Sequence, residues 1–377
     1  DHRDLHSFPT RRSSDLFRAK FWPRGVLKCK ASDRDDPTID PNYGRVGKQV
    51  IENTGPMDSK RMETIDAEFI AAAKDFIERQ QKSGTPWFCY LNTTRMHVFT
   101  HLKKESQGKT GLGIYPDGMV ETDGHVGELL QLIDDLGAAD NTIVVYTTDN
   151  GAEVFTWPDG GTTPFRGEKA TNWEGAFRVP CLIRWPGVIK PGIIVNDICA
   201  HEDFIPTFAA MAGEPDLVDK LMKGQTLNGK AFKVHLDGFN LLPFFRGEAK
   251  QSPREGFVYW SDDGELMAMR LRNWKLTFME QNTEVTPQTP AGVWQGQFTK
   301  LRAPNIYNLR ADPFERATSS LNYGDWMDHR MFLIVPAQAM AQRWIESFKM
   351  FPPRAKAASF TISDVMEKIT TARPNAN

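Results

Sequence analysis

The sequence predicts an α/β protein: a layered, mostly parallel sheet flanked by helices, followed by a small antiparallel α+β domain. Helix-like and strand-like segments alternate before about residue 250. Strand-like runs such as Trp87–Asn92 are continuously apolar, as in strands covered on both faces. Beyond residue 250, short strand-like segments are separated by turns. A chain of 377 residues with 40% hydrophobic content can form a large core and two or three units.

The start of the chain looks foreign to the fold. Residues 1–16 (DHRDLHSFPTRRSSDL) begin without Met and show neither helical nor strand periodicity. They resemble a translated sequencing adapter, so they are excluded from fold reasoning. We therefore expect a natural segment upstream of Phe17 to be missing. Residues 17–58 are rich in Pro, Gly and Asp, which predicts a long irregular surface segment.

Two helices and two strands are predicted in the stretch that follows. The first helix ends at Lys82–Pro86, and its apolar residues recur at helical spacing: Met62, Ile65, Phe69, Ile70, Ala73, Phe76 and Ile77. Trp87–Asn92 follows as a strand. A second helix, from Met119 to Leu136, ends near Gly137 and leads into a strand that begins at Ile143.

The remaining elements fall on either side of a predicted domain boundary near residue 250. Before it we expect a strand at Cys181–Ile183 and a helix at Asp203–Ala212. The boundary separates residues 17–250 from residues 251–377. The second part should form an antiparallel sheet with a terminal helix, with strands at 256–260, 265–271, 274–279 and 305–309 and the helix at 337–348.

Composition excludes two classes of partner. The 46 Lys and Arg residues nearly balance the 48 Asp and Glu residues, and no long run of one sign occurs, so we expect no nucleic acid. Apolar runs such as Met331–Val335 are too short to span a bilayer, so we expect no membrane segment. The four cysteines form no C-x-x-C pair and are expected to be core thiols.

The most informative polar residues follow the Ile143 strand. Asp149 and Asn150 offer a charged and a neutral oxygen at a strand end, where open α/β sheets place metals and anionic ligands. Asp-Asn-Gly is also a common turn sequence. Lys169 comes at the end of a glycine-rich loop, where a lysine is ordinarily solvated. His97 and His101 follow the Trp87 strand, where a histidine is more often structural.

The segment from Thr142 to Pro186 resembles the second half of the sulfatase active site, close to bacterial arylsulfatases. The resemblance runs from about Phe17 to Glu315. It is carried by Thr148-Asp149-Asn150-Gly151, Pro164-Phe165-Arg166-Gly167-Glu168-Lys169, Trp173-Glu174-Gly175 and Arg178-Val179-Pro180.

The resemblance implies an alkaline-phosphatase-like fold and a set of residue roles. Asp149 and Asn150 would bind one Ca²⁺ ion, whose remaining ligands we expect in the missing N-terminal part. Lys169 would bind the sulfate and assist departure of the leaving group. His97 would contact the sulfate and serve as general acid, and His101 would shape the substrate pocket.

The family's nucleophile is a formylglycine made from the first residue of Cys/Ser-x-Pro/Ala-x-Arg. At Cys29 the arginine is one residue too far away. Ser7-Phe8-Pro9-Thr10-Arg11 matches, but it lies in the foreign leader with no strand before it, and we interpret it as a coincidence. We expect the nucleophile segment to be missing, so that this chain alone is inactive and poorly soluble.

The function predicted for the full-length parent is hydrolysis of O-sulfate esters. Its substrate would be a sulfate-ester small molecule or a sulfated glycan, and a formylglycine-generating enzyme would mature it. Relatives are often exported to the periplasm. The alternatives are a phosphoesterase of the alkaline-phosphatase-like superfamily and a non-catalytic relative that binds sulfated glycans. The residues leave the natural substrate open among aryl, polysaccharide and lipid sulfates.

Overall fold

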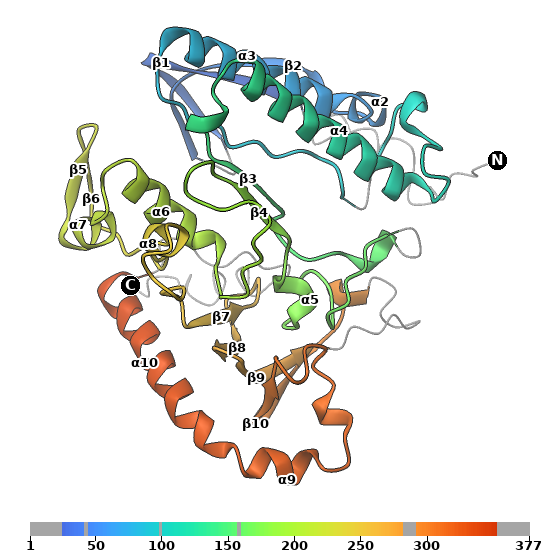
Figure 1. The fold of residues 1–377 in the computed structure, drawn as a ribbon, viewed down its shortest axis with the longest axis vertical. Coiled ribbons are helices and arrows are strands. Elements are labelled where there is room, and N and C mark those ends of the chain that lie inside the picture. Colours follow the sequence, from blue (N-terminus) through green and yellow to red (C-terminus); the bar gives the residue numbers. More distant parts are fainter. Residues whose placement is uncertain (1–24, 41–43, 98–99, 157–159, 282–291, 353–377) are drawn as a thin grey trace, which may run out of the picture. The chain divides into compact units, whose positions relative to one another are not determined.

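The computed structural model describes residues 25–40, 44–97, 100–156, 160–281 and 292–352 (Figure 1). The chain divides into two compact units. The first comprises residues 1–139 with 158–160, and the second comprises 140–157 with 161–377. None of the helices in the described ranges combines the length and the apolar composition needed to cross a bilayer.

The first unit begins with a long antiparallel hairpin. Strand β1 (Gly25–Asp40) pairs with β2 (Gly44–Pro56), drawn in blue in Figure 1. The irregular segment predicted for residues 17–58 is therefore wrong where the structure describes it. The Asp- and Pro-rich stretch coincides with register shifts between Ala31 and Ile39. Bulges tolerate such residues because the ladder is locally interrupted there.

The two helices predicted for this unit are confirmed. After the short helix α2 (Ser59–Met62), helix α3 (Ile65–Ser83) lies beside α4 (Ile114–Asp135), as Figure 1 shows. Helix α3 ends at Gly84, whose φ of 64° is a left-handed cap that glycine adopts at low cost. Its apolar stripe is buried at Ile65, Ile70, Ala73 and Ile77.

The strand predicted at Trp87–Asn92 is wrong. These residues form no regular element, and Phe88 and Tyr90 are 68% and 80% exposed. A strand requires a hydrogen-bonded partner strand. Among the described residues, no strand pairs with this segment. An apolar run alone cannot supply that partner.

The second unit carries the predicted Ile143 strand as β3 (Val144–Thr147), which pairs with β4 (Cys181–Arg184). This ladder is antiparallel, as are all the others that join described strands. The predicted parallel arrangement is therefore not formed between them. The connection between β3 and β4 is a loop that contains one short helix, α5 (Glu174–Phe177). It leads into β4 at the same end of the ladder at which β3 finishes, so the two strands run antiparallel. A parallel pair would need a long crossover connection, usually a helix, back to the other end.

The cysteine prediction is largely wrong. All four thiols are free; Cys29, Cys181 and Cys199 are exposed, and Cys89 is half-buried. Cys29 lies on the exposed hairpin and Cys181 on the two-stranded β3–β4 ladder. Neither ladder is covered there by the described residues, so neither thiol reaches a core.

The middle of the second unit contains short elements. Helix α6 (Phe204–Met211) confirms the helix predicted at Asp203–Ala212. The other helices and strands here are α7 (Leu217–Lys223), β5 (Gln225–Leu227), β6 (Lys230–Phe232) and α8 (Leu242–Phe245). Single 3₁₀ turns occur along the described chain at Lys104–Ser106, Ala139–Asn141, Val154–Thr156, His201–Asp203, Gly292–Trp294, Ala317–Ser319 and Met331–Leu333.

The predicted antiparallel C-terminal sheet is confirmed. Its strand order is β10-β9-β8-β7, with β7 (Gly256–Trp260), β8 (Leu266–Leu271), β9 (Trp274–Gln281) and β10 (Phe298–Asn308). Helices α9 (Tyr323–Asp328) and α10 (Ile334–Met350) follow, and the core joins sheet and helix at Leu276, Ile306, Leu333 and Ala337. The domain boundary near residue 250 stays a prediction.

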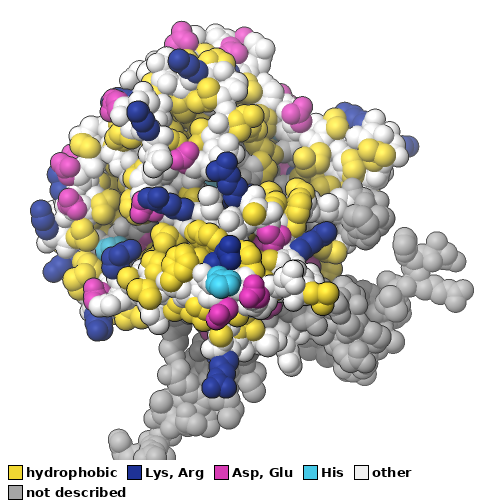
Figure 2. All heavy atoms as spheres, turned by 60° about the horizontal axis from the view of Figure 1, so that its bottom comes forward, with side chains coloured by type: hydrophobic (Ala, Val, Ile, Leu, Met, Phe, Trp, Pro, Cys, Tyr) yellow, Lys and Arg dark blue, Asp and Glu magenta, His cyan; other side chains and the backbone are white. Residues whose placement is uncertain are grey.

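The surface seen in Figure 2 mixes apolar and charged side chains. Figure 2 shows yellow apolar groups interspersed with lysine, arginine and acidic groups on one face. Val335 and Ile345 of α10 are 68% and 55% exposed. Scattered apolar residues of this kind are ordinary on a protein surface.

A buried ion cluster joins the C-terminal sheet to the loop before α5. The Lys275 ammonium lies 2.7 Å from Glu315 Oε1 and 3.2 Å from Glu174 Oε1, and all three side chains are at most 1% exposed. Tyr259 donates its hydroxyl proton to Glu174 at 2.6 Å. Burial alone would raise the pKa of Glu174, but Lys275 and Arg270 outweigh it and lower that pKa to about 2.

Replacing the central cation should destabilise the protein strongly. Lys275→Met removes the cation that pairs with buried Glu315 and leaves Glu174 only its ion pairs with Arg178 and Arg270, so we expect a loss of about 3–5 kcal/mol in the free energy of unfolding. Lys300→Met is the matched control, because Lys300 pairs with Glu265 on the surface and should cost about 1 kcal/mol or less. Urea denaturation measures both. Equal losses would contradict a structural role for the cluster.

The same cluster predicts acid sensitivity. A carboxyl whose folded-state pKa is lowered contributes stability above its ordinary value of 4.5, and that contribution is lost as the pH falls toward 2. In Glu174→Gln the free energy of unfolding should therefore fall less steeply across this pH window. Glu265→Gln, which removes an exposed carboxylate, should keep the wild-type slope. Denaturation at a series of pH values would refute the assignment if Glu174→Gln and wild type have parallel curves.

Candidate functional site

The end of β3 presents two oxygen ligands. Asp149 is exposed and Asn150 is half-buried. The Asn150 amide nitrogen donates to the Gly151 carbonyl at 2.9 Å, which leaves its oxygen as the ligating end of the amide. The Thr148 hydroxyl lies 3.4 Å from Asp149 Oδ1. A carboxylate and an amide oxygen therefore stand side by side at an accessible strand end.

The glycine-rich loop brings the Lys169 backbone beside Ala152, which follows the end of β3. The Lys169 amide donates to the Ala152 carbonyl at 3.0 Å, and the Gly151 amide donates to the Ala176 carbonyl at 2.8 Å. Gly151 lies so close to Gly175 that an added Cβ would be 1.8 Å from the Gly175 carbonyl oxygen. A Cβ on Gly175 would itself lie 2.5 Å from the carbonyl oxygens of Arg166 and Gly167, so both positions require glycine. The structure brings Asp149, Asn150 and Lys169 to one edge.

The Lys169 side chain is oriented by two residues that the sequence did not single out. Its ammonium lies 3.8 Å from Glu153 Oε2 and 5.8 Å from the centre of the Trp294 ring. The Trp294 indole N–H donates to Glu153 at 2.7 Å. The only feature of the sequence that could have pointed to Glu153 is its position four residues after Asp149. No feature of the sequence pointed to Trp294.

Neighbouring charges of the loop have structural partners. Glu168 is buried and accepts from the Val154 amide at 2.6 Å, and burial raises its pKa. Arg166 lies over the Trp173 ring at 3.5 Å and donates to the Glu315 carbonyl at 2.8 Å. Arg166 therefore packs the loop against the C-terminal sheet.

The two predicted histidines belong to the first unit. His97 is exposed, and its carbonyl accepts from the Thr100 hydroxyl at 2.6 Å. His101 is half-buried. Asp149 and Lys169 belong to the second unit, so the joint role of the histidines with them stays a prediction.

A buried carboxylate fixes the turn that carries His97. Asp66 of α3 accepts from the amides of Thr94 and Arg95 at 2.7 and 3.0 Å. The Arg95 guanidinium is 1% exposed and lies 2.9 Å from Glu121 of α4. Arg95 thus anchors this turn between two helices and is not available as an extra cation for a ligand.

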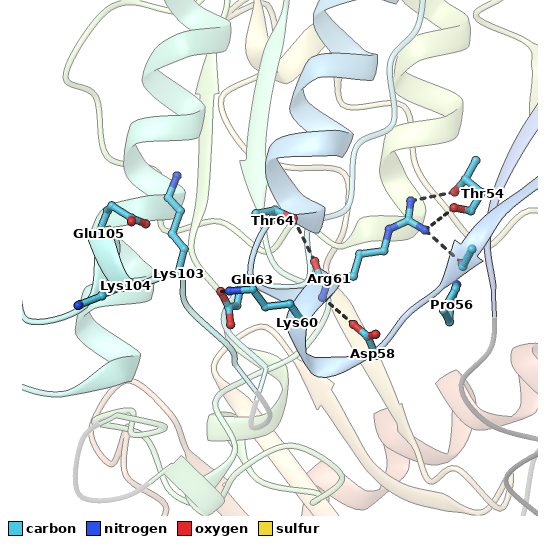
Figure 3. Close-up of a pocket in the computed structure, with 11 residues that line it drawn as sticks. Thr54, Pro56, Asp58, Lys60, Arg61, Glu63, Thr64, Lys103, Lys104 and Glu105 are labelled. Atoms are coloured by element: carbon cyan, nitrogen blue, oxygen red, sulfur yellow. Dashed lines mark hydrogen bonds and ion pairs between the residues drawn. The ribbon is translucent and has the colours of Figure 1, made fainter.

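The first unit also contains a cavity of about 660 Å³ between the hairpin end and residues 103–105 (Figure 3). Lys60 and Arg61, two of the four cationic residues in its lining, have partners within that lining. Lys60 lies 2.6 Å from Glu63, and Arg61 donates to the carbonyls of Thr54 and Gly55. Lys103 and Lys104 also line the cavity, but Asp58, Glu63 and Glu105 offset most of the positive charge, so it is not concentrated as an anion site requires.

The residues at the β3 end fit a hard cation in part. Carboxylate and amide oxygens are the ligands Ca²⁺ prefers, and it takes roughly six to eight of them. Asp149 and Asn150 provide two such groups. No group of three or more His, Cys, Asp or Glu residues placed to hold a metal occurs within the described ranges. Water or other residues would complete the coordination.

Family models match most of the chain. The model described as "Sulfatase" matches residues 21–214, and the model described as "C-terminal region of aryl-sulfatase" matches residues 252–351. Among curated relatives, human arylsulfatase A is 32% identical over 258 residues, covering 67% of this chain and 48% of the relative. N-acetylgalactosamine-6-sulfatase from Canis lupus familiaris is 31% identical, covering 69% and 49%. The chain spans about half the length of these relatives.

Solved structures agree with the fold class. The sulfatase PsFucS1 from Pseudoalteromonas sp. matches with a TM-score of 0.68 and 25% identity, covering 81% of this chain and 57% of that one. Ps i-CgsB in complex with k-i-k-neocarrahexaose matches with a TM-score of 0.54 and 19% identity, covering 86% and 63%. The predicted alkaline-phosphatase-like α/β fold with a C-terminal antiparallel sheet is confirmed.

Removing the buried carboxylate of α3 should loosen the His97 turn. Asp66→Asn weakens two charge-assisted hydrogen bonds, so we expect the amides of residues 94–97 to exchange hydrogen at least about tenfold faster. Asp75→Asn on the same helix is the control, since Asp75 forms only an exposed pair with Arg79. Hydrogen exchange followed by mass spectrometry distinguishes them. Unchanged exchange in Asp66→Asn would show that Asp66 does not hold the turn.

Proposed function

Because the chain belongs to the sulfatase family, we propose that its Asp149–Lys169 edge serves the hydrolysis of O-sulfate esters in the whole protein. The observation that carries the proposal is the return of the Lys169 loop to the end of β3 through the Lys169–Ala152 and Gly151–Ala176 backbone bonds. These bonds bring a cationic side chain to the edge that bears a carboxylate and an amide oxygen.

Asp149 and Asn150 are proposed as two ligands of one Ca²⁺ ion. Asp149 supplies charge and Asn150 supplies its amide oxygen, which the hydrogen bond to Gly151 keeps turned outward. A bound divalent cation would neutralise charge on the sulfuryl oxygens. Exposure of Asp149 leaves room for the further ligands that Ca²⁺ requires.

Lys169 is proposed to bind a sulfuryl oxygen and to stabilise the leaving oxygen. Its 3.8 Å separation from Glu153 is longer than a direct hydrogen bond, so the ammonium can donate to a bound anion without giving up a strong partner. Glu153 and Trp294 lie beside its ammonium, and the 24% exposure of the side chain permits access from solvent.

The remaining roles follow the family pattern. His97 would protonate the leaving group, and His101 would shape the substrate pocket. The nucleophile would be a formylglycine introduced by a maturation enzyme, and we assign it to none of the described residues. We accordingly expect no turnover of aryl sulfate by this chain alone, since a nucleophile is required for attack on sulfur.

The substrate is proposed to be a sulfated glycan or a smaller sulfate ester. The names of the relatives point to this class: one is an N-acetylgalactosamine-6-sulfatase, and one solved neighbour is in complex with a neocarrahexaose. The exposed β3 end would accept a sulfate group that projects from a larger molecule.

The metal proposal is tested by titration with CaCl₂. We expect the amide resonances of Asp149, Asn150 and Gly151 to shift, with weak affinity on the order of 10⁻³ M because few ligands come from these residues. Asp149→Asn should abolish the shifts. Asp140→Asn, at an exposed carboxylate just before β3, should preserve them. Shifts that persist in Asp149→Asn would place the cation elsewhere.

The anion proposal is tested with p-nitrophenyl sulfate as a bound probe in saturation-transfer NMR with Ca²⁺ present. Lys169→Met removes a charge-assisted hydrogen bond and should weaken binding about tenfold. Lys190→Met, at an exposed loop lysine, is the control. Equal binding by Lys169→Met and wild type would contradict the role of Lys169. Tighter binding of p-nitrophenyl phosphate would favour a phosphoesterase instead.

A further inference from the structure

A second cavity, of about 450 Å³, lies in the second unit against strand β7 and helix α10. Its size falls within the range of small-ligand pockets. Strand β7 is one of the two edge strands of the C-terminal sheet. The residues that line the cavity take no part in the proposed metal and sulfate site.

One wall of the cavity is aromatic and held in place by ring contacts. Trp260 of β7 and Trp344 of α10 have ring centroids 6.4 Å apart and planes inclined by 53°. Phe257 and Phe177 meet edge to face at 5.7 Å. All four side chains are half-buried, so each is packed but retains some exposed surface. Such a wall offers π-faces to the C–H groups of a ligand.

A second part of the lining, the polar wall, consists of Glu202, His235 and Asp237. His235 Nδ1 lies 3.0 Å from Asp237 Oδ1, which fixes the imidazole and leaves Nε2 to contact a ligand. Glu202 places one oxygen 2.9 Å from Arg254, and its side chain remains 36% exposed. The wall therefore offers carboxylate acceptors and a ring nitrogen.

A buried arginine organises this polar wall. The Arg254 guanidinium is 3% exposed and bonds both oxygens of Asp203, at 2.8 and 2.7 Å. It also donates to the Asp237 carbonyl at 3.1 Å and pairs with Glu202. One buried cation thus fixes both the segment that carries Glu202 and the segment that carries Asp237 before a ligand binds, as a preorganised site requires.

The two walls together define the chemistry of the ligand. An aromatic face packs against apolar C–H groups, while carboxylates and an imidazole accept hydrogen bonds from hydroxyl groups; a sugar ring has both. Asp203 already balances the charge of Arg254, so Glu202 and Asp237 make the cavity acidic and disfavour a sulfate group. We propose that this cavity binds an unsulfated sugar unit of a glycan, a proposal that rests on the proposed action on glycans.

The test uses the 377-residue chain and the neutral galactan oligosaccharide neoagarohexaose in isothermal titration calorimetry. Trp344→Ala removes an aromatic anchor and should weaken binding at least about tenfold. Ile345→Ala, the adjacent and 55% exposed position on α10, should change affinity by less than about twofold. Glu202→Gln retains the shape of the site and should also weaken binding, because a charged acceptor becomes neutral.

The outcomes separate this inference from the proposed sulfatase site. Absence of neoagarohexaose binding, or equal affinity in wild type, Trp344→Ala and Glu202→Gln, would overturn it. Tighter Trp344-dependent binding of sulfated κ-neocarrahexaose would also overturn it, since the acidic wall should repel sulfate. The CaCl₂ titration of Asp149 is run on the same sample. If sugar binding is absent while the Ca²⁺-induced shifts are present, only the proposal of a sugar site is refuted. If the sugar binds but the Ca²⁺-induced shifts are absent, only the proposal of a metal site is refuted.

Discussion

The second unit depends on a lysine buried between two carboxylates. Lys275 of β9 contacts Glu174, which begins α5, and Glu315, which follows the sheet. Charges this deeply buried are tolerated only when they are paired and hydrogen-bonded, so the cluster fixes where the loop before α5 meets the sheet. Arg166 strengthens the same junction through the Glu315 carbonyl. The loop that carries Lys169 is thus held at its far end by the C-terminal sheet.

The near end of the loop is fixed by backbone packing. Gly151 lies so close to the Gly175 carbonyl that no side chain fits at position 151, and the Lys169 amide bonds to Ala152. These two constraints act on opposite ends of one connection. They bring the backbone of Lys169, which lies twenty positions after Asp149 in the sequence (169 − 149 = 20), beside Ala152 near the end of β3. In the first unit, a single buried carboxylate fixes a turn in a similar way: Asp66 accepts hydrogen bonds from the backbone amides just before His97.

Local signals in the sequence were sufficient for the helices and for the C-terminal sheet. The helical stripe of α3 and the turn-separated strands from Gly256 to Asn308 each specify their own structure. Asp149, Asn150 and Lys169 could be proposed as site residues from the sequence, because each lies in a short contiguous motif. Features that depend on a distant partner were not predictable: Trp87–Asn92 finds no pairing strand among the described residues, and Trp294 reaches Glu153 from 141 positions away.

The central claim is that the end of β3 and the Lys169 loop form one cation-and-anion site. Paramagnetic relaxation by Mn²⁺, which accepts the same oxygen ligands as Ca²⁺, tests it most directly. The account predicts strong broadening of the amide resonances of Asn150, Gly151 and Lys169 together, and its loss in Asp149→Asn. Broadening that spares Lys169 while affecting Asn150, or that is centred on another part of the chain, would contradict the account.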